Sequence, residues 1–130
     1  MPGPSEEPAA EPGAEPPRTP GRRERLRVIV RDESMLPTLA PGDRLLVDRA
    51  AYIARPPRPG EIVVLADPQE PSRWLVKRVA AIDPGSGQVD VRGDATERAR
   101  DSRRFGPVAR SAIVGRAYRL YLPRSRRREL

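Results

Sequence analysis

The sequence predicts a small all-β domain of closed or partly closed sheets, preceded by a disordered tail. Stretches rich in Val, Ile, Leu and aromatic residues recur from residue 26 onward, and turn sequences such as Pro-Gly, Asp-Pro and Gly-Asp separate them. No stretch shows the capped 3.6-residue apolar period that an amphipathic helix requires. The 130 residues therefore allow one β-rich domain with a core of about a hundred residues.

The N-terminal segment has the composition of a disordered tail. Residues 1–20 contain seven of the 17 prolines and four glutamates, but no aromatic or β-branched aliphatic residue. Such a segment cannot bury enough apolar surface to order itself. We therefore predict that residues 1–25 form a tail, rich in Pro, Glu and Ala at first and basic at its end. The first 20 residues have a net charge of −3, which leaves +10 on residues 21–130.

The domain itself is expected at residues 26–123. Its strands are predicted from their β-branched, Leu and aromatic content at residues 26–31, 43–49, 61–66, 73–82, 88–92 and 112–122. Residues 50–59 are predicted to form a loop that can contain one helical turn, because prolines interrupt regular structure there. The arginine cluster at residues 124–130 predicts a solvated basic C-terminal tail.

The composition excludes several kinds of catalytic site. The chain has no cysteine, so it has neither disulfides nor thiol chemistry, and it has no histidine, which excludes a Ser-His-Asp triad. Zinc would be left with carboxylate ligands alone, so no metal and no other cofactor is predicted. An enzyme of this composition must take its base from Lys, Asp, Glu or Tyr.

The sequence also bears on location. No apolar run reaches the roughly 18–20 residues of a membrane-spanning helix, and the N-terminus lacks the apolar core of a secretory signal. We therefore expect a cytoplasmic protein without a transmembrane anchor.

Ser34 is the first candidate catalytic residue. It begins the segment SMLPTL (34–39), between a β-branched run and a Pro-Gly-Asp turn. Pro37 fixes its own φ and restricts Leu36, so the backbone bends sharply after the serine. A serine in a turn is ordinary by itself. A second residue makes it a candidate nucleophile.

That residue is Lys77, the one lysine among the 25 Lys and Arg residues. Arginine stays charged in proteins, whereas a desolvated lysine can lose its proton near neutral pH. Lys77 lies in the apolar strand pattern 74–81, where a period of two makes Leu75, Val79 and Ala81 its face-mates. A neutral lysine beside a serine is a general base beside a nucleophile. The alternative is a lysine that packs its stem on the strand and extends its amine into solvent.

Several blocks of the chain resemble the signal peptidase I family of Ser-Lys endopeptidases. They are, in the order of the family, SMLPTL (34–39), PGDRLLV (41–47), LVKRV (75–79), GD (93–94) and DSRRFGPV (101–108). Within that family the chain looks most like the nickel-type superoxide dismutase maturation protease, through RPGEIVVL (58–65), LVKRVAAI (75–82) and IVGRAYRLYLP (113–123). The resemblance implies a β-barrel of the family's catalytic-core type over residues 26–123.

The resemblance also implies roles for individual residues. Ser34 would be the nucleophile and Lys77 the general base, while the Ser34 backbone N–H and a donor at the Asp32 position would bind the oxyanion. The other implied residues are Met35 and Leu36 as walls of the substrate pockets, and Gly93, Asp94 and an Asp101–Arg103 ion pair on one strand face as structural support. The implied partner is a precursor protein with an N-terminal leader, and the nearest resemblance suggests the nickel superoxide dismutase precursor.

Three positions depart from the family's pattern. Asp32 stands where Gly or Ser is typical, so its carboxylate must point away from the oxyanion or weaken the oxyanion site. Ala95 replaces the Asn of a Gly-Asp-Asn block, and Ala99 replaces a hydroxyl residue that helps to orient the lysine amine. These departures leave open a catalytically weakened or inactive protein that acts by binding.

Two further alternatives are open. The self-cleaving domain of repressors such as the SOS regulator also has a Ser-Lys dyad, but residues 1–25 supply no DNA-binding domain. A non-catalytic β-barrel could bind nucleic acid through its arginines, since the net charge is +7 and the pI about 11.0. The five aromatic residues are not interleaved with the basic ones as stacking platforms would be, so no nucleic-acid partner is expected.

Overall fold

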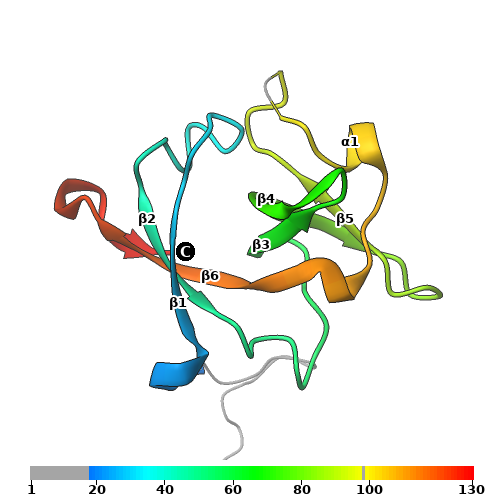
Figure 1. Ribbon diagram of the computed structural model, residues 1–130, viewed down its shortest axis with the longest axis horizontal. Helices are drawn as coiled ribbons and strands as arrows, with labels where there is room; N and C mark the ends of the chain where they lie inside the picture. Colours follow the sequence, from blue (N-terminus) through cyan, green and yellow to red (C-terminus); the bar gives the residue numbers. More distant parts are fainter. Residues whose placement is uncertain (1–17, 98) are drawn as a thin grey trace, which may run out of the picture.

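The computed structural model describes residues 18–97 and 99–130, and the fold is of the predicted all-β type. One antiparallel sheet has the strand order β1-β2-β6-β3-β4-β5, with β7 paired to β6 (Figure 1). The strands are β1 (Arg25–Ile29), β2 (Arg44–Asp48), β3 (Ile62–Asp67), β4 (Glu70–Ile82), β5 (Val89–Arg92), β6 (Ile113–Leu122) and β7 (Arg128–Glu129). The sheet is not closed, since β1 and β5 lie at opposite ends of this order.

Helical structure is limited to short turns within the described residues. They are α1 (Ser102–Phe105) and the 3-10 turns η2 (Arg22–Glu24), η3 (Arg110–Ala112) and η4 (Arg124–Arg126). The absence of a capped 3.6-residue period in the sequence agrees with this result.

Strand β6 joins the two halves of the sheet. It pairs with β2 on one edge and with β3 on the other, so that Ala117 lies opposite both Val47 and Ile62. Gly115 permits the close approach of β2, because a Cβ at this position would lie 2.4 Å from the backbone oxygen of Asp48. The strand therefore runs across the molecule as one continuous ribbon (Figure 1).

Strand β3 is buried on both faces and separates two hydrophobic clusters. Alternate side chains of residues 62–65 enter one cluster or the other, as the period of a strand requires. The first cluster contains Met35, the neighbour of Ser34. The second surrounds the strand of Lys77 with the side chains of Val63, Leu65, Leu75, Val79, Val89, Val91 and Val108. Different parts of the core therefore anchor the two candidate residues.

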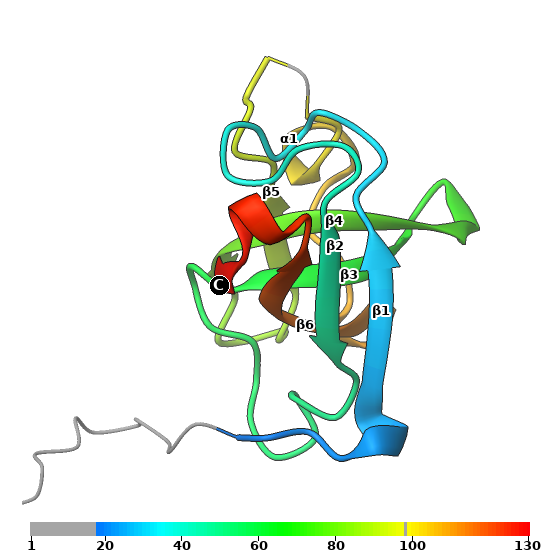
Figure 2. The ribbon, with the colours of Figure 1, turned by 90° about the vertical axis from the view of Figure 1, so that its left-hand side faces the viewer.

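Strand β4 is longer than the sequence indicated. It begins at Glu70 instead of residue 73, because Asp67 and Glu70 pair across a two-residue turn. Residues 70–74 are exposed and gave no hydrophobic signal. Figure 2 shows this end of the β3–β4 hairpin projecting from the rest of the molecule. The prediction that Ala81 shares the buried face of Lys77 is wrong: a bulge between Val79 and Ala81 breaks the alternation, and Ala81 is exposed.

The segment just before β1 is ordered, contrary to the prediction of disorder through residue 25. Pro20 is buried, and the Arg18 guanidinium pairs with the carboxylates of Asp48 and Glu24. The physical reason is that Asp48 is nearly buried at the end of β2 and is stabilised by a cation. The rest of the predicted tail, residues 1–17, lies outside the described residues.

The C-terminal residues 124–130 do not form the solvated tail that their arginines suggested. Arg126 donates to both carboxylate oxygens of the buried Asp43, with N–O distances of 3.0 and 3.2 Å from its Nε. Strand β7 pairs with β6, and Leu130 packs against the first hydrophobic cluster. The composition of this segment does not indicate these partners, because they lie far away in the sequence.

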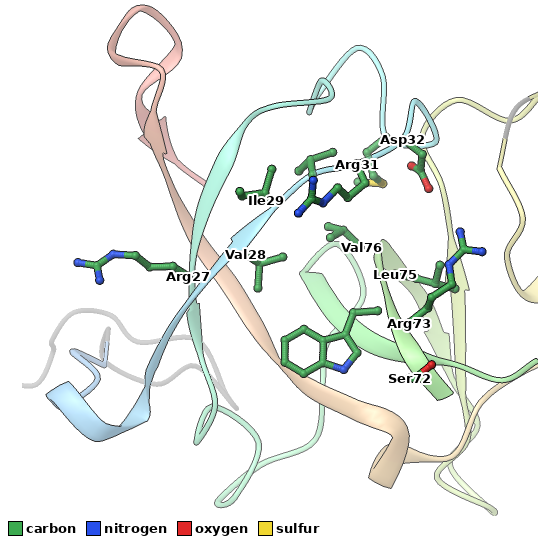
Figure 3. A pocket seen from close by; sticks show the side chains of 12 residues that line it. Arg27, Val28, Ile29, Arg31, Asp32, Ser72, Arg73, Leu75 and Val76 are labelled. Atoms are coloured by element: carbon green, nitrogen blue, oxygen red, sulfur yellow. The ribbon is translucent and has the colours of Figure 1, made fainter. Parts of the chain in front are cut away.

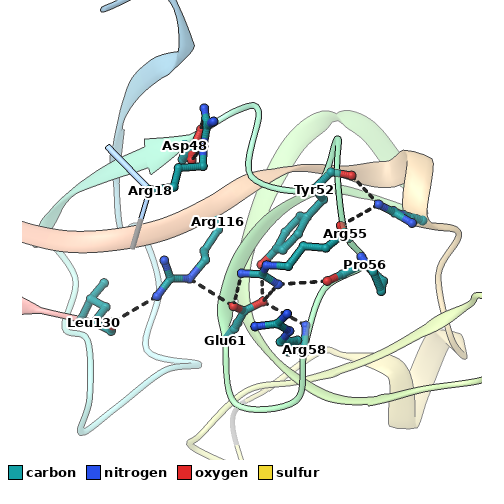
Figure 4. A network of polar contacts seen from close by, with 10 residues as sticks. Arg18, Asp48, Tyr52, Arg55, Pro56, Arg58, Glu61, Arg116 and Leu130 are labelled. Atoms are coloured by element: carbon teal, nitrogen blue, oxygen red, sulfur yellow. Dashed lines mark hydrogen bonds and ion pairs between the residues drawn. The ribbon is translucent and has the colours of Figure 1, made fainter. Parts of the chain in front are cut away.

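The predicted loop 50–59 forms no helix or strand, and a polar network holds it to the sheet. The Glu61 carboxylate accepts hydrogen bonds from the Tyr52 hydroxyl at 2.9 Å, from Arg55 at 2.7 Å and from the Arg58 backbone N–H at 2.9 Å. Arg116 of β6 approaches the same carboxylate at 3.5 Å (Figure 4). This one carboxylate therefore connects the loop, the start of β3 and β6.

Candidate active site

Ser34 lies in the loop between β1 and β2, and the base of that loop is closed by the backbone. Val30 N–H donates to the Asp43 carbonyl at 2.9 Å, and Gly42 N–H donates to the Val30 carbonyl at 2.8 Å. Two side chains of the loop, Met35 and Leu39, are buried in the first hydrophobic cluster. The apolar spacing within SMLPTL thus anchors the loop, and Ser34 itself is 3% exposed.

A polar chain connects this loop to β4 and to the segment after β5. The Ser34 carbonyl accepts a hydrogen bond from the Ala95 N–H at 2.9 Å. The Thr38 hydroxyl donates to Asp94 at 2.5 Å, and Arg78 donates to the same carboxylate at 2.9 and 2.8 Å. Asp94 therefore lies between the serine loop and the strand that carries Lys77, and Ala95 contributes through its backbone alone.

Gly93 lies against the loop that carries Ser34. A Cβ at this position would lie 2.6 Å from the Ser34 backbone oxygen and 2.5 Å from the Ala99 Cβ. Arg78 pairs with Arg92 across β4 and β5, and these two residues are the direct neighbours of Lys77 and Gly93 in the sequence. Opposed residues of an antiparallel pair point to the same face of the sheet. Lys77 pairs with Val63 of β3, so its side chain points to the face of the sheet that carries the second hydrophobic cluster.

Lys77 is buried without a charge partner. Its side chain is among the largest fully buried ones, with 1% exposed, between the buried face-mates Leu75 and Val79. Within residues 18–97 and 99–130, its amine has no hydrogen bond or ion pair. Burial lowers the pKa of Lys77 below its ordinary value, because the charged amine loses its hydration.

Charges at longer range modify that effect. The carboxylates of Asp32, Asp101 and Asp67 raise the pKa of Lys77, whereas the Arg100 guanidinium lowers it further, and burial remains the largest influence. A depressed pKa enlarges the fraction of neutral amine at a given pH, and the neutral amine is the form that can accept a proton.

The Ser34 hydroxyl is also buried without a partner. Its Oγ has no hydrogen bond within the part of the chain that the structure describes. Buried hydroxyls are normally satisfied, and unsatisfied ones concentrate at sites of catalysis or binding. Ser34 Oγ therefore makes no hydrogen bond to Lys77 Nζ, and catalytic hydrogen bonds are commonly looser in apo sites than in loaded ones.

Of the two alternatives that the sequence leaves for Asp32, the structure does not show a carboxylate that points away from the serine. Its Oδ1 accepts a hydrogen bond from the Ser34 backbone N–H at 3.0 Å. An aspartate commonly accepts from the N–H two residues further along the chain, which explains the local geometry. The N–H predicted as the first oxyanion donor is thus already bonded to a carboxylate.

The ion pair between Asp101 and Arg103 is present, but it does not lie on a strand. Asp101 caps the N-terminus of α1, where it accepts from the Arg103 backbone N–H at 3.0 Å and from the Arg103 guanidinium at 2.5 Å. It also accepts from the Gly93 N–H at 2.8 Å. Burial raises its pKa, but these hydrogen bonds outweigh burial and hold the pKa at about 2. The sequence-based assignment failed because a single helical turn has no periodicity to detect.

Ser102 does not supply the hydroxyl that Ala99 lacks. It is the first residue of α1, and its Oγ accepts a hydrogen bond from the Val91 N–H at 2.9 Å. The Ala99 methyl instead lies against Gly93, where an ideal Cβ on the glycine would be 2.5 Å away from it. No described side chain replaces the missing hydroxyl at the lysine amine.

A groove of about 550 Å³ is lined by Asp32 and Met35 of the serine loop, whereas Ser34 and Lys77 are not among its lining residues. One wall consists of β1 and the residues after it, and the other is the projecting part of β4 (Figure 3). The residues that line it are Arg27, Val28, Ile29, Val30, Arg31, Asp32, Met35, Ser72, Arg73, Trp74, Leu75 and Val76. Met35 lines the groove as expected, whereas Leu36 is half-buried outside it.

The β4 wall was missed in the sequence. Trp74 is 47% exposed, an unusual state for the single tryptophan of a small domain. Trp74 stands three residues before Lys77 in the sequence, and this position could have indicated the wall. An exposed aromatic side chain near a catalytic candidate suggests a binding surface.

No helix in the described part of the chain is both long and apolar enough to span a membrane. The same residues contain no group of three or more acidic, His or Cys side chains placed to hold a metal ion.

Comparison with known proteins identifies the family. Residues 26–86 match the family described as signal peptidase, peptidase S26. The chain is 38% identical to the mitochondrial ATP-independent inner membrane protease subunit 1b of Arabidopsis thaliana, over 64% of this chain and 62% of the plant protein. It is 30% identical to signal peptidase I of Leptolyngbya laminosa, over 75% of this chain and 69% of the relative. The match to the plant subunit thus spans less than two thirds of that protein's length. On these matches, the chain belongs to the signal peptidase (S26) family.

Proposed function

We propose that the protein is a serine endopeptidase in which Ser34 is the nucleophile and neutral Lys77 the general base. One observation carries the proposal. The buried Ser34 hydroxyl has no hydrogen bond in the described chain, the backbone of its loop touches Gly93, and the buried Lys77 lies on the strand that pairs with β5 up to Arg92, the residue before that glycine. Burying two unsatisfied polar groups costs stability, and a catalytic role explains why they are kept.

The chemistry follows from the two groups. Ser34 Oγ attacks the carbonyl carbon of the scissile peptide while its proton passes to Lys77 Nζ. The leaving amine takes that proton as the C–N bond breaks, and the leader remains as an ester on Ser34. A water molecule then gives a proton to Lys77 and attacks the ester. The leader leaves with a new carboxyl group as Ser34 recovers its proton.

The groove supports binding of an extended peptide. β1 pairs with β2 on one edge, and the described pairing of β4 with β5 begins only at Arg78. The free edges of β1 and of residues 72–76 both border the groove. A peptide strand can add to such edges through its backbone, and side-chain pockets then supply specificity. Met35 closes the groove near Ser34, where a small side chain at the cleavage site would fit.

The proposed substrate is a precursor protein with an N-terminal leader. The resemblance of residues 58–65, 75–82 and 113–123 to the nickel-type superoxide dismutase maturation protease makes the nickel superoxide dismutase precursor the first substrate to test. The relatives named above are a mitochondrial inner membrane protease subunit and a signal peptidase I, and processing of a leader agrees with both names. A cytoplasmic location stays a prediction from the sequence.

A second candidate function is binding without cleavage. The hydrogen bond from the Ser34 N–H to Asp32 favours it, because the resting oxyanion site lacks a free donor at this position. Ala99 also favours binding without cleavage, since it stands where the family has a hydroxyl residue that helps to orient the lysine amine.

Incubation with the precursor separates these functions. The purified protein and its Ser34→Ala variant are mixed with the nickel superoxide dismutase precursor, and the new N-terminus is read by mass spectrometry. The proposal predicts one cut by the wild type and none by the variant. Equal cutting by both proteins would exclude Ser34 as the nucleophile. Binding of the precursor by both, without a cut, would establish the second candidate.

A further inference from the structure

Asp32 occupies a place in the site that neither the family's pattern nor the dyad explains. It lines the substrate groove, and its Oδ1 is 3.0 Å from the Ser34 nitrogen. Figure 3 shows Asp32 on one wall of the groove and Arg73 and Leu75 on the other. Its carboxylate also acts electrostatically on Lys77 and on Arg100. One side chain thus influences the backbone of the proposed nucleophile and the amine of the proposed base.

The position of this carboxylate conflicts with catalysis. The tetrahedral intermediate of acyl transfer carries a negative oxygen that needs preorganised N–H donors. The Ser34 N–H cannot serve that oxygen while it is bonded to Asp32, and two negative oxygens at one donor repel each other. We propose that Asp32 is a built-in restraint on peptide cleavage, which must release the Ser34 N–H before the oxyanion can form. This inference rests on the proposed peptidase function and deepens it.

The restraint has two separable parts. The first is geometric, because the carboxylate occupies a donor. The second is electrostatic, because the negative charge of Asp32 favours the protonated form of Lys77 and so reduces the amount of active base. The other charged groups that act on this amine are Asp101, Asp67 and Arg100, and they are unchanged by substitution of Asp32.

Two substitutions separate the parts. Asp32→Asn keeps a side-chain oxygen that can accept from the Ser34 N–H but removes the charge. Asp32→Ala removes both. Because Asp32 is exposed and takes no part in the core, both variants should fold. Asp83→Asn is the matched control, since it removes one negative charge in the exposed turn between β4 and β5.

Precursor cleavage is measured for the four proteins as a function of pH. Removing one oxyanion donor typically costs about 10²–10³ in rate, so freeing one should raise the plateau rate of Asp32→Ala at least about tenfold. Asp32→Asn should raise the plateau less but lower the pH of half-maximal rate. Asp83→Asn should follow the wild type in both quantities.

A measurement without turnover tests the same contact. Lys77 is the one lysine of the chain, so selectively labelled lysine gives a single side-chain NMR signal whose titration reports its pKa. Both Asp32 variants should lower that pKa. The Ser34 amide signal should move in Asp32→Ala and remain near its wild-type position in Asp32→Asn.

The outcomes distinguish the restraint from the function on which it rests. If the wild type cuts, Ser34→Ala does not, and Asp32→Ala cuts no faster than the wild type, the peptidase function stands and the restraint is overturned. If only Asp32→Ala cuts, both stand. If neither protein cuts under any condition, both are overturned, because release of the donor then restores nothing.

Discussion

Gly93 lies so close to Ser34 that no side chain fits between them. An ideal Cβ at Gly93 would be 2.6 Å from the Ser34 carbonyl oxygen, a distance that real contacts do not show. The same glycine donates its N–H to Asp101 and follows Arg92, which pairs with Arg78, the neighbour of Lys77. This one close approach sets how far the serine loop stands from the lysine strand.

Gly93→Ala should therefore separate the two segments. The added methyl group meets backbone and the Ala99 side chain, neither of which can move freely, so we expect a loss of about 1–3 kcal/mol in the free energy of unfolding. Precursor cleavage should fall as well. Gly85→Ala is the control, because its Cβ would meet only the Asp83 carboxylate at 3.7 Å. Equal stability of the two variants in denaturant would contradict the packing argument.

The low pKa of Asp101 predicts how the free energy of unfolding depends on pH. Its pKa is about 2 in the folded protein, below the ordinary value of 3.8 that the unfolded chain has. The unfolded state therefore binds more protons between these values, and the stabilisation of about 2 kcal/mol present above pH 4 is lost as pH falls toward 2. Unfolding in denaturant at several pH values measures this slope. Asp101→Asn should flatten it, and a variant that keeps the full wild-type slope would refute the assignment.

Arg126 should contribute to stability despite its place near the C-terminus. It donates to Asp43, whose carboxylate is buried, and Arg126→Ala leaves that charge with the Ala40 N–H as its remaining side-chain contact. We expect the free energy of unfolding to fall, because a buried carboxylate loses its charged partner. Arg127→Ala removes an exposed neighbouring arginine and should change little. Thermal unfolding measures the stability of both variants. If residues 124–130 were a solvated tail, Arg126→Ala and Arg127→Ala would be equally stable.

Trp74 tests the substrate groove. Because its ring lines the groove and is half exposed, Trp74→Ala should weaken binding of an extended peptide while leaving the fold intact. Loss of about 1–2 kcal/mol of apolar contact corresponds to a rise in KM of roughly tenfold. Ile53→Ala is the control, since Ile53 is an exposed apolar residue outside the groove. An unchanged KM in Trp74→Ala would place the substrate elsewhere.

Much of the fold followed from the sequence because its strands alternate and end at strong turn signals. All six predicted strands exist, with ends shifted by at most a few residues. The elements that were missed have no such signal. β7 consists of Arg128 and Glu129, which pair with β6 only because Arg126 and Leu130 have partners elsewhere in the fold.

Some features of the candidate site could also be predicted from the sequence, and others could not. The burial of Lys77 could be predicted because its strand pattern places it inside, and its unique residue type in the chain made it a candidate base. The direction of the Asp32 side chain could not be identified, because it depends on a turn of the backbone at Ser34. The groove was equally hidden, since its second wall is an exposed part of β4 with no periodic signal.

The most direct test of the dyad is precursor cleavage by Lys77 variants across a range of pH. Lys77→Arg keeps a cation that cannot act as a base, and Lys77→Met keeps an apolar stem that suits the buried position. Near-ultraviolet circular dichroism shows that each variant is folded. We predict that wild-type cleavage rises with pH as the Lys77 amine loses its proton, and that both variants stay at background at every pH. Cleavage by folded Lys77→Met at the wild-type rate would contradict the account.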